Sequence, residues 1–366
     1  MSLAATDEVD SESRGGTTRD VWFPWTFRRI LALPGSPFAI GIGAGLLSLV
    51  VTAAWFNASG MWHGYRREGI PIWLHPSASY ELAWPVFLGY AAVALIYLVR
   101  GAHRDLSQLG PALGLAPGPL AEVRREVLSV PARSLRVGTA LGLAIAAFDL
   151  RVIFAYANLE GFSSMTQLWV LTREILYNVL VFRVLTWAIV VAIRLSRLAR
   201  ERVHVNLVDL EPLRPFSQNG NRLALFWLLL WAIWAPTLFL IPAERNVLLA
   251  SAILMGVGIA LSAAAIAIPT LGVHRRLSET KAAELAEVRG TIESDRAAAL
   301  DPNHPDRTAA ATRLPGLLAY EARVAAVPEW LLDSHSLRRV GLYLLIPVAS
   351  WVGGAMIERL VDSALD

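Results

Sequence analysis

The chain has 366 residues, of which 55% are hydrophobic and 17% are charged, and its formal net charge at pH 7 is +3. About a quarter of the residues of a soluble protein are charged, so a mean hydropathy of +0.47 argues against a soluble domain and favours an all-α protein that crosses a membrane several times. The chain contains no cysteine, which excludes disulfides, thiolate metal sites and a cysteine nucleophile.

The first segment, residues 1–20, is polar and acidic at its start. It lacks the basic start, the apolar run and the small-residue cleavage site of a signal peptide, and we expect a disordered cytoplasmic tail. Tryptophans and arginines follow, a combination typical of the membrane surface. We expect residues 21–270 to form a transmembrane region of six helices joined by amphipathic cytoplasmic loops.

Apolar stretches long enough to cross a hydrocarbon core of about 30 Å need roughly 20 residues. Seven stretches qualify: residues 37–56, 81–99, 135–156, 175–193, 223–241, 247–269 and 340–357. With the amino terminus in the cytoplasm, most of the 33 basic residues lie on inner segments, and such an excess sets the orientation. We therefore expect about seven transmembrane helices, a cytoplasmic amino terminus and a carboxyl terminus outside. The basic residues are arginines except Lys281, a bias that favours a bacterial source and a location in the bacterial inner membrane, that is, the plasma membrane.

Small residues recur at four-residue spacing in the first, third and sixth predicted spans. They are Gly41 and Gly45, then Gly138 and Gly142, then Ala252, Gly256, Ala260 and Ala264. Small residues let helix backbones approach closely in lipid, where burial of apolar surface gives no driving force. We expect these positions to pack helices together, either within one bundle or between protomers of a homo-oligomer.

Arg183 lies inside the fourth predicted span, where a charge is unfavourable by about 2.5–3.5 kcal/mol on insertion scales. Asp149 of the third span has a similar estimated depth, so we expect an Asp149–Arg183 ion pair. Arg151 and Glu174 are expected to form a second pair nearer the outer surface. Three interpretations of Arg183 stay open: a structural pair, a lining of an aqueous path that attracts anions, and a side chain that extends to the membrane surface.

The last predicted span differs from the others because proline and glycine interrupt it and charges flank it. Irregular backbone can line a water-filled path, and the candidate pore-lining residues are Arg338, Arg339, Pro347, Ser350, Gly353, Gly354 and Glu358. The alternative is a tightly packed helix that ends in a charged turn. We expect this helix and an outer tail to make up residues 336–366.

The segment before the last span, residues 271–335, is expected to be cytoplasmic and helical. Its apolar residues predict a helix over 272–300, a break at 301–307 and a second helix over 314–327. We expect the first of these helices to pack on other cytoplasmic loops, including residues 203–222. A coiled coil is a weaker alternative because the apolar spacing covers fewer than three heptads.

No motif for catalysis, nucleotide binding or metal binding is present in the sequence. We therefore expect no enzyme activity, no cofactor, no metal and no nucleic-acid partner. Two hypotheses remain. The first is an oligomeric channel or permease for ions or small solutes. The second is a membrane scaffold or signalling protein that transports nothing and docks a protein partner through its cytoplasmic helices.

Overall fold

The computed structural model describes residues 33, 35–58, 76–156, 164–238, 245–330, 345 and 356. For a few stretches at helix ends within these ranges it describes the backbone alone. The described residues are almost entirely helical and include no strand beyond an isolated bridge between Asn206 and Asp209. The expected all-α fold is therefore confirmed.

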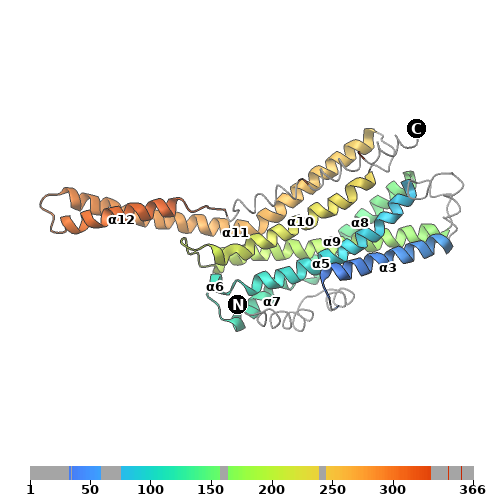
Figure 1. Ribbon diagram of the computed structural model, residues 1–366, viewed down its shortest axis with the longest axis horizontal. Helices are drawn as coiled ribbons and strands as arrows, with labels where there is room; N and C mark the ends of the chain where they lie inside the picture. The colour runs from blue at the N-terminus through green and yellow to red at the C-terminus, as the bar shows by residue number, and fades with distance from the viewer. Residues whose placement is uncertain are drawn as a thin grey trace.

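Six long helices coincide with the first six predicted spans as far as the described residues reach (Figure 1). They are α3 (Pro37–Ala58), α5 (Pro76–Ser107), α8 (Ala132–Tyr156), α9 (Ser164–Arg202), α10 (Arg214–Leu238) and α11 (Arg245–Leu300). The short elements between them are α6 (Gly110–Leu113), α7 (Pro117–Leu128) and η2 (Glu211–Leu213), and α12 (Arg307–Ala325) follows α11. The seventh predicted span lies outside the described residues, apart from two single positions.

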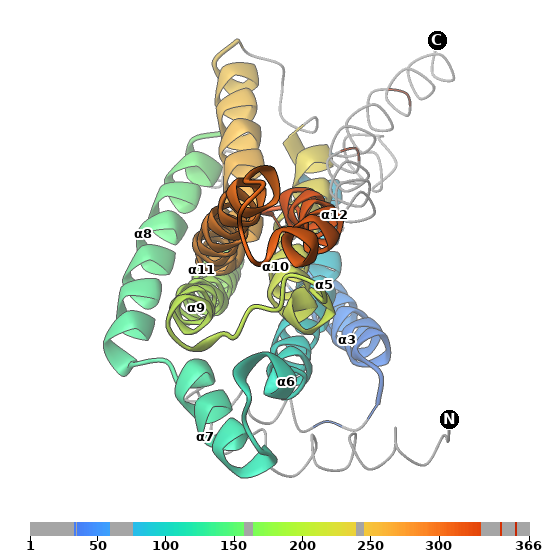
Figure 2. The ribbon, with the colours of Figure 1, turned by 90° about the vertical axis from the view of Figure 1, so that its left-hand side faces the viewer.

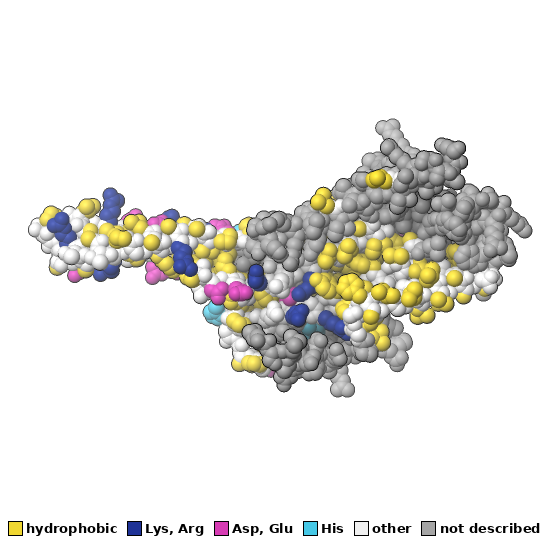
Figure 3. Space-filling view, in the orientation of Figure 1, with side chains coloured by type: hydrophobic (Ala, Val, Ile, Leu, Met, Phe, Trp, Pro, Cys, Tyr) yellow, Lys and Arg dark blue, Asp and Glu magenta, His cyan; other side chains and the backbone are white. Residues whose placement is uncertain are grey.

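Four helices among the described residues, α3, α5, α9 and α11, are long and apolar enough to cross a membrane. On α3 the side chains of Phe38, Ile42, Leu47 and Val50 are exposed, which suits a helix that faces lipid rather than water. Figure 3 shows hydrophobic side chains spread over this part of the bundle. The helix α8 is less apolar, because it carries arginines near its start and Asp149 near its end.

Glycines bring neighbouring helices into backbone contact. Gly41 and Gly45 of α3 lie against Gly89 of α5, where an added Cβ would be 2.8 Å from the Gly41 oxygen. On α8, a Cβ at Gly138 would be 2.9 Å from the Phe182 oxygen of α9. Small residues at these positions therefore lie where two helices touch.

The small-residue ridge of the sixth predicted span does not pack on a described helix. Gly256 and Ala260 are exposed, and a Cβ at Gly256 would meet open space. Instead, α11 packs on α9 at Gly272. The backbone oxygen of Ser196 lies so close to Gly272 that a Cβ would not fit there. Ala264 is half-buried, and the side chain of Ala252 lies outside the described residues. A contact between protomers at this ridge stays a prediction.

The main hydrophobic core lies at the end of the bundle from which α11 and α12 project, which we call the hairpin end. It includes Leu106 of α5, Leu128 of α7, Trp187 and Leu195 of α9 and Phe216 of α10. A buried ion pair joins Asp105 of α5 to Arg222 of α10 within this region. Several apolar residues of α9 between 186 and 193 thus pack in this protein core.

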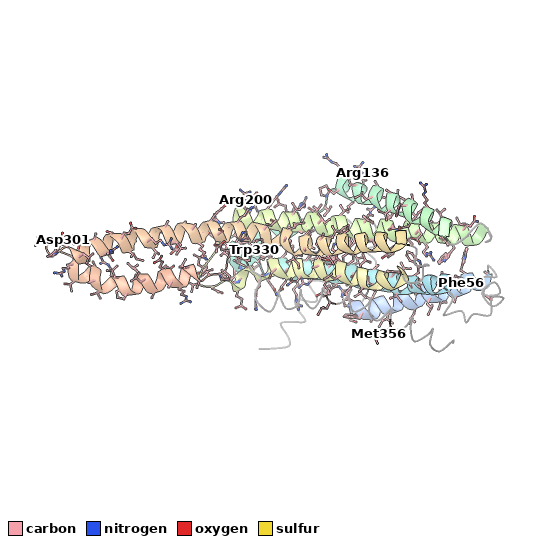
Figure 4. All side chains as sticks on the ribbon, turned by 90° about the horizontal axis from the view of Figure 1, so that it is seen from above. Phe56, Arg136, Arg200, Asp301, Trp330 and Met356 are labelled. Atoms are coloured by element: carbon pink, nitrogen blue, oxygen red, sulfur yellow. The ribbon has the colours of Figure 1, made fainter. Side chains whose placement is uncertain are left out.

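The α11–α12 hairpin projects away from the bundle (Figures 1 and 2). Figure 4 places Asp301 at its tip and Trp330 where it meets the bundle. The helix α11 runs for 56 residues without interruption, so the expected boundary between residues 270 and 271 falls inside one helix. The expectation that α11 packs on cytoplasmic loops was wrong for the part of the helix that projects from the bundle, because this part pairs with α12.

Polar contacts fix the register of this hairpin. Arg313 of α12 donates hydrogen bonds of 3.0 and 2.8 Å to the Asp295 carboxylate of α11. These hydrogen bonds hold the pKa of the Asp295 carboxyl below its usual value. Tyr320 donates to Glu284 at 2.9 Å, and Lys281 donates to the Val327 oxygen at 2.8 Å. The hairpin is therefore a defined antiparallel pair instead of a single extended helix.

Candidate functional site

A group of polar side chains, buried except for the half-buried Asp149, lies between α5, α8 and α9, toward the end of the bundle opposite the hairpin. We call Trp84, Asp149, Arg173, Glu174 and Asn178 the polar cluster. Trp84 comes from α5, Asp149 from α8, and the other three residues from α9. Ionisable groups at such a depth between apolar helices are unfavourable, and they mark functional sites more often than other buried positions do.

The centre of the polar cluster is an ion pair within α9. Arg173 Nη2 lies 3.2 Å from Glu174 Oε1, and the two side chains are 4% and 2% exposed. The Arg173 guanidinium also lies 4.4 Å from the centre of the Trp84 ring, a distance at which the aromatic face attracts a cation. Both charges are thus removed from solvent and held in place by two helices.

Aromatic rings cover one side of the polar cluster. Trp84 meets Tyr177 edge-on with the ring centres 4.8 Å apart, and Phe87 lies 5.7 Å from the same Tyr177 ring. All three rings are almost fully buried. Because aromatic rings exclude water from the charges, electrostatic interactions inside the cluster are stronger than at the surface.

Asn178 connects the carboxylate of α8 to the backbone of α9. Its Nδ2 donates to Asp149 Oδ2 at 3.1 Å and to the Glu174 carbonyl oxygen at 3.1 Å. This link requires α8 and α9 to lie close together. Gly142 allows the close approach, since an added Cβ would lie 2.7 Å from the backbone oxygen of Asn178. The amide therefore uses both of its donor hydrogens, and it fixes the position of Asp149.

The polar cluster offers two carboxylates and one guanidinium, a set that can exchange a proton or attract a small cation. It does not have the composition of a metal centre, and no group of three His, Asp or Glu side chains among the described residues could hold a metal ion. It also has no nucleophile paired with a base. Its side chains are suited to interact with a charged group in surroundings of low polarity.

The structure does not form the expected Asp149–Arg183 ion pair. Arg183 Nη1 donates instead to Thr139 Oγ1 at 3.1 Å, and Asp149 accepts from Asn178. Thr139 and Asp149 are ten residues apart on α8, or about 15 Å. The cause is the start of α9, which begins at Ser164 and not near residue 175, so Arg183 lies closer to the hairpin end than the sequence indicated.

The expected pair of Arg151 with Glu174 is also corrected. Glu174 contacts its neighbour Arg173, whereas the Arg151 side chain is exposed, and the ion pairs of the described residues do not include Arg151. The candidate pore-lining residues, Arg338, Arg339, Pro347, Ser350, Gly353, Gly354 and Glu358, lie outside the described residues.

Sequence reasoning missed Trp84, Arg173 and Asn178. A signal was present, because Glu174 and Asn178 are four residues apart, as are Arg173 and Tyr177, and this spacing places each pair on one side of a helix. We expected the span to begin at residue 175, which left Arg173 and Glu174 outside it and Asn178 inside it. Trp84 could not be found in the same way, since it lies far away in the sequence.

Together, the fold and the polar cluster define an all-helical protein whose long apolar helices fit a lipid environment. No protein-family model, no curated protein and no solved structure matches the chain. Any statement about its function therefore rests on the residues themselves.

Proposed function

We propose that the protein is a multi-pass anchor of the bacterial inner membrane that presents the α11–α12 hairpin to a protein partner in the cytoplasm. In this proposal the chain crosses the membrane seven times, with the amino terminus inside and the carboxyl terminus outside. The distribution of arginines supports this orientation, because positive charge is concentrated on the segments assigned to the inner side.

The observation that carries the proposal is the length of α11. Its 56 residues extend over about 84 Å at 1.5 Å per residue, whereas a hydrocarbon core is about 30 Å thick. In this proposal roughly two thirds of the helix therefore lies beyond the hydrocarbon core. The part that lies beyond it on the hairpin side carries Glu287, Arg289, Glu293 and Arg296 on exposed positions, a surface suited to water and to a protein partner.

The hairpin is also built to keep its shape. The Asp295–Arg313 and Arg289–Glu321 ion pairs join the two helices at two levels. The ring of His274 stacks on Trp330, with ring centres 4.0 Å apart, and this contact ties α11 to the segment that follows α12. A rigid element loses little conformational freedom on binding, so more of the contact energy appears as affinity. Exposed leucines, among them Leu318, supply apolar surface for such a contact.

A channel or permease is the second candidate, and the polar cluster favours it. Buried ionisable groups at membrane depth are frequent on ion and proton paths. In this alternative the protein is a homo-oligomer, and Asp149, Arg173 and Glu174 lie beside the path of the transported species. The inner helices then hold the subunits together.

One set of measurements separates the two functions. A photo-reactive amino acid in place of Gly290 on the hairpin is expected to give one adduct of defined mass with another protein in cells, and Leu318→Glu is expected to abolish it. The same amino acid at Gly43 of α3 is the matched control, since both glycines face open space. The purified chain is expected to give no currents in planar bilayers. Unitary currents that change with Asp149→Asn, together with no adduct at Gly290, would contradict docking and support the channel.

A further inference from the structure

The surface of α8 changes from basic to apolar within one helical turn. Arg133 and Arg136 are exposed near its start, and exposed apolar residues follow, among them Val137 at 55% and Phe148 at 63%. Such a change is expected where a lipid-facing helix leaves the hydrocarbon core. It places the level of the lipid headgroups close to Arg136.

Arg183 of α9 reaches this same level. Its Nη1 donates to Thr139, which follows Arg136 by three residues on α8, and residues at this spacing are neighbours on a helix surface. The Arg183 Nε is buried and has no hydrogen-bond partner. The guanidinium is thus anchored through Nη1, and its Nη2, which bonds to no described residue, retains donors for another acceptor.

Acidic side chains do not neutralise these two arginines. Among the described residues, the ion pairs include neither Arg136 nor Arg183. The nearest segment of α7 presents the Glu126 carbonyl oxygen to Arg194, while the Glu126 side chain is exposed. The first amides of α8 add the partial positive charge of a helix amino terminus. Arg136 and Arg183 therefore form a patch of uncompensated positive charge where α8 meets α9, which we call the basic patch.

We propose that the basic patch binds the phosphate of an anionic phospholipid through Arg136 and Arg183. The guanidinium groups match the geometry of phosphate oxygens, and Thr139 holds Arg183 in place. The exposed apolar side chains of Val137 and Leu141 lie on the same helix as Arg136, and the acyl chains of a lipid can pack on them. A free phosphate ion would leave this apolar surface uncovered. The inference requires that α8 and α9 lie in a membrane, and it is independent of docking and of transport.

The test measures lipid selectivity of the full chain in phosphatidylcholine vesicles by electron paramagnetic resonance. Spin-labelled phosphatidylglycerol is expected to associate more strongly than spin-labelled phosphatidylcholine. Arg136→Gln and Arg183→Gln are each expected to lower this selectivity by a factor of up to about five, because a basic residue near an anionic surface contributes about that factor. Arg183→Lys is expected to retain most of the selectivity because it keeps the charge.

Arg200→Gln is the matched control. Arg200 is exposed on the same helix, about 25 Å from Arg183, and Figure 4 shows it nearer to the hairpin than Arg136. The proposal is overturned if the wild-type chain shows no selectivity, if neither glutamine variant lowers it, or if Arg200→Gln lowers it equally. Selectivity that disappears when inorganic phosphate replaces chloride at constant ionic strength would instead assign the basic patch to a free anion. Thermal unfolding in detergent verifies that each variant is folded.

Discussion

Replacing Gly142 by alanine is expected to destabilise the fold by about 1–3 kcal/mol, the usual effect of overpacking a well-packed contact. The added Cβ would lie 2.7 Å from the Asn178 oxygen and 2.7 Å from the Val179 Cα. Because these atoms belong to the backbone of α9, no side-chain rotation can relieve the contact. The two helices must separate, which also weakens the hydrogen bond from Asn178 to Asp149. The free energy of unfolding in detergent micelles measures this effect.

Gly256→Ala is the matched control, since it places the same methyl group on a helical glycine that faces open space. Alanine restricts the unfolded chain more than glycine does, so this variant is expected to be as stable as the wild type or slightly more stable. Equal destabilisation by the two substitutions would contradict close backbone contact between α8 and α9 at Gly142.

Replacing Asp105 by alanine is expected to destabilise the protein by about 3–5 kcal/mol, because it leaves a buried arginine without its counter-charge. The side chains of Arg222 and Asp105 are 15% and 2% exposed. Arg222 reaches Asp105 across Gly101, where an added Cβ would be 2.7 Å from the arginine side chain. Chemical unfolding in detergent gives the free-energy difference.

Two comparisons make this result specific. Glu211→Ala removes an exposed ion pair with Arg214, where the side chains are 77% and 63% exposed, and it is expected to change stability by about 1 kcal/mol or less. The double variant Asp105→Ala with Arg222→Met is expected to recover most of the stability, since replacing a whole buried pair by apolar groups is often neutral. A double variant as unstable as Asp105→Ala alone would contradict the argument from an unpaired charge.

The helices were predictable from the sequence, and their ends were not. Apolar runs of about 20 residues marked six of the long helices correctly, because such runs need a helical backbone in lipid. The start of α9 was placed about eleven residues too late, since Thr172, Arg173 and Glu174 look like the end of a span. In the structure Thr172 donates to the Leu168 oxygen of the preceding turn, and Arg173 pairs with Glu174 and lies over the Trp84 ring of α5, so the helix continues through these residues.

The length of α11 shows a second limit of sequence reasoning. The change from apolar to charged residues near Pro269 suggested a boundary, whereas the backbone continues as one helix. Hydropathy reports the surroundings of a helix and not its ends. The polar cluster was hidden for a different reason: Trp84 and Arg173 meet only after α5 packs near α9, and no local pattern predicts that contact.

The central claim is that the hairpin and the far end of the bundle lie on opposite sides of a membrane. The absence of native cysteines allows a direct measurement with single cysteines at Gly290 of the hairpin and at Asn57 near the end of α3. We predict that a membrane-impermeant thiol reagent labels Asn57→Cys in intact cells and labels Gly290→Cys only after the membrane is opened. Labelling of both positions from the same side would contradict the account.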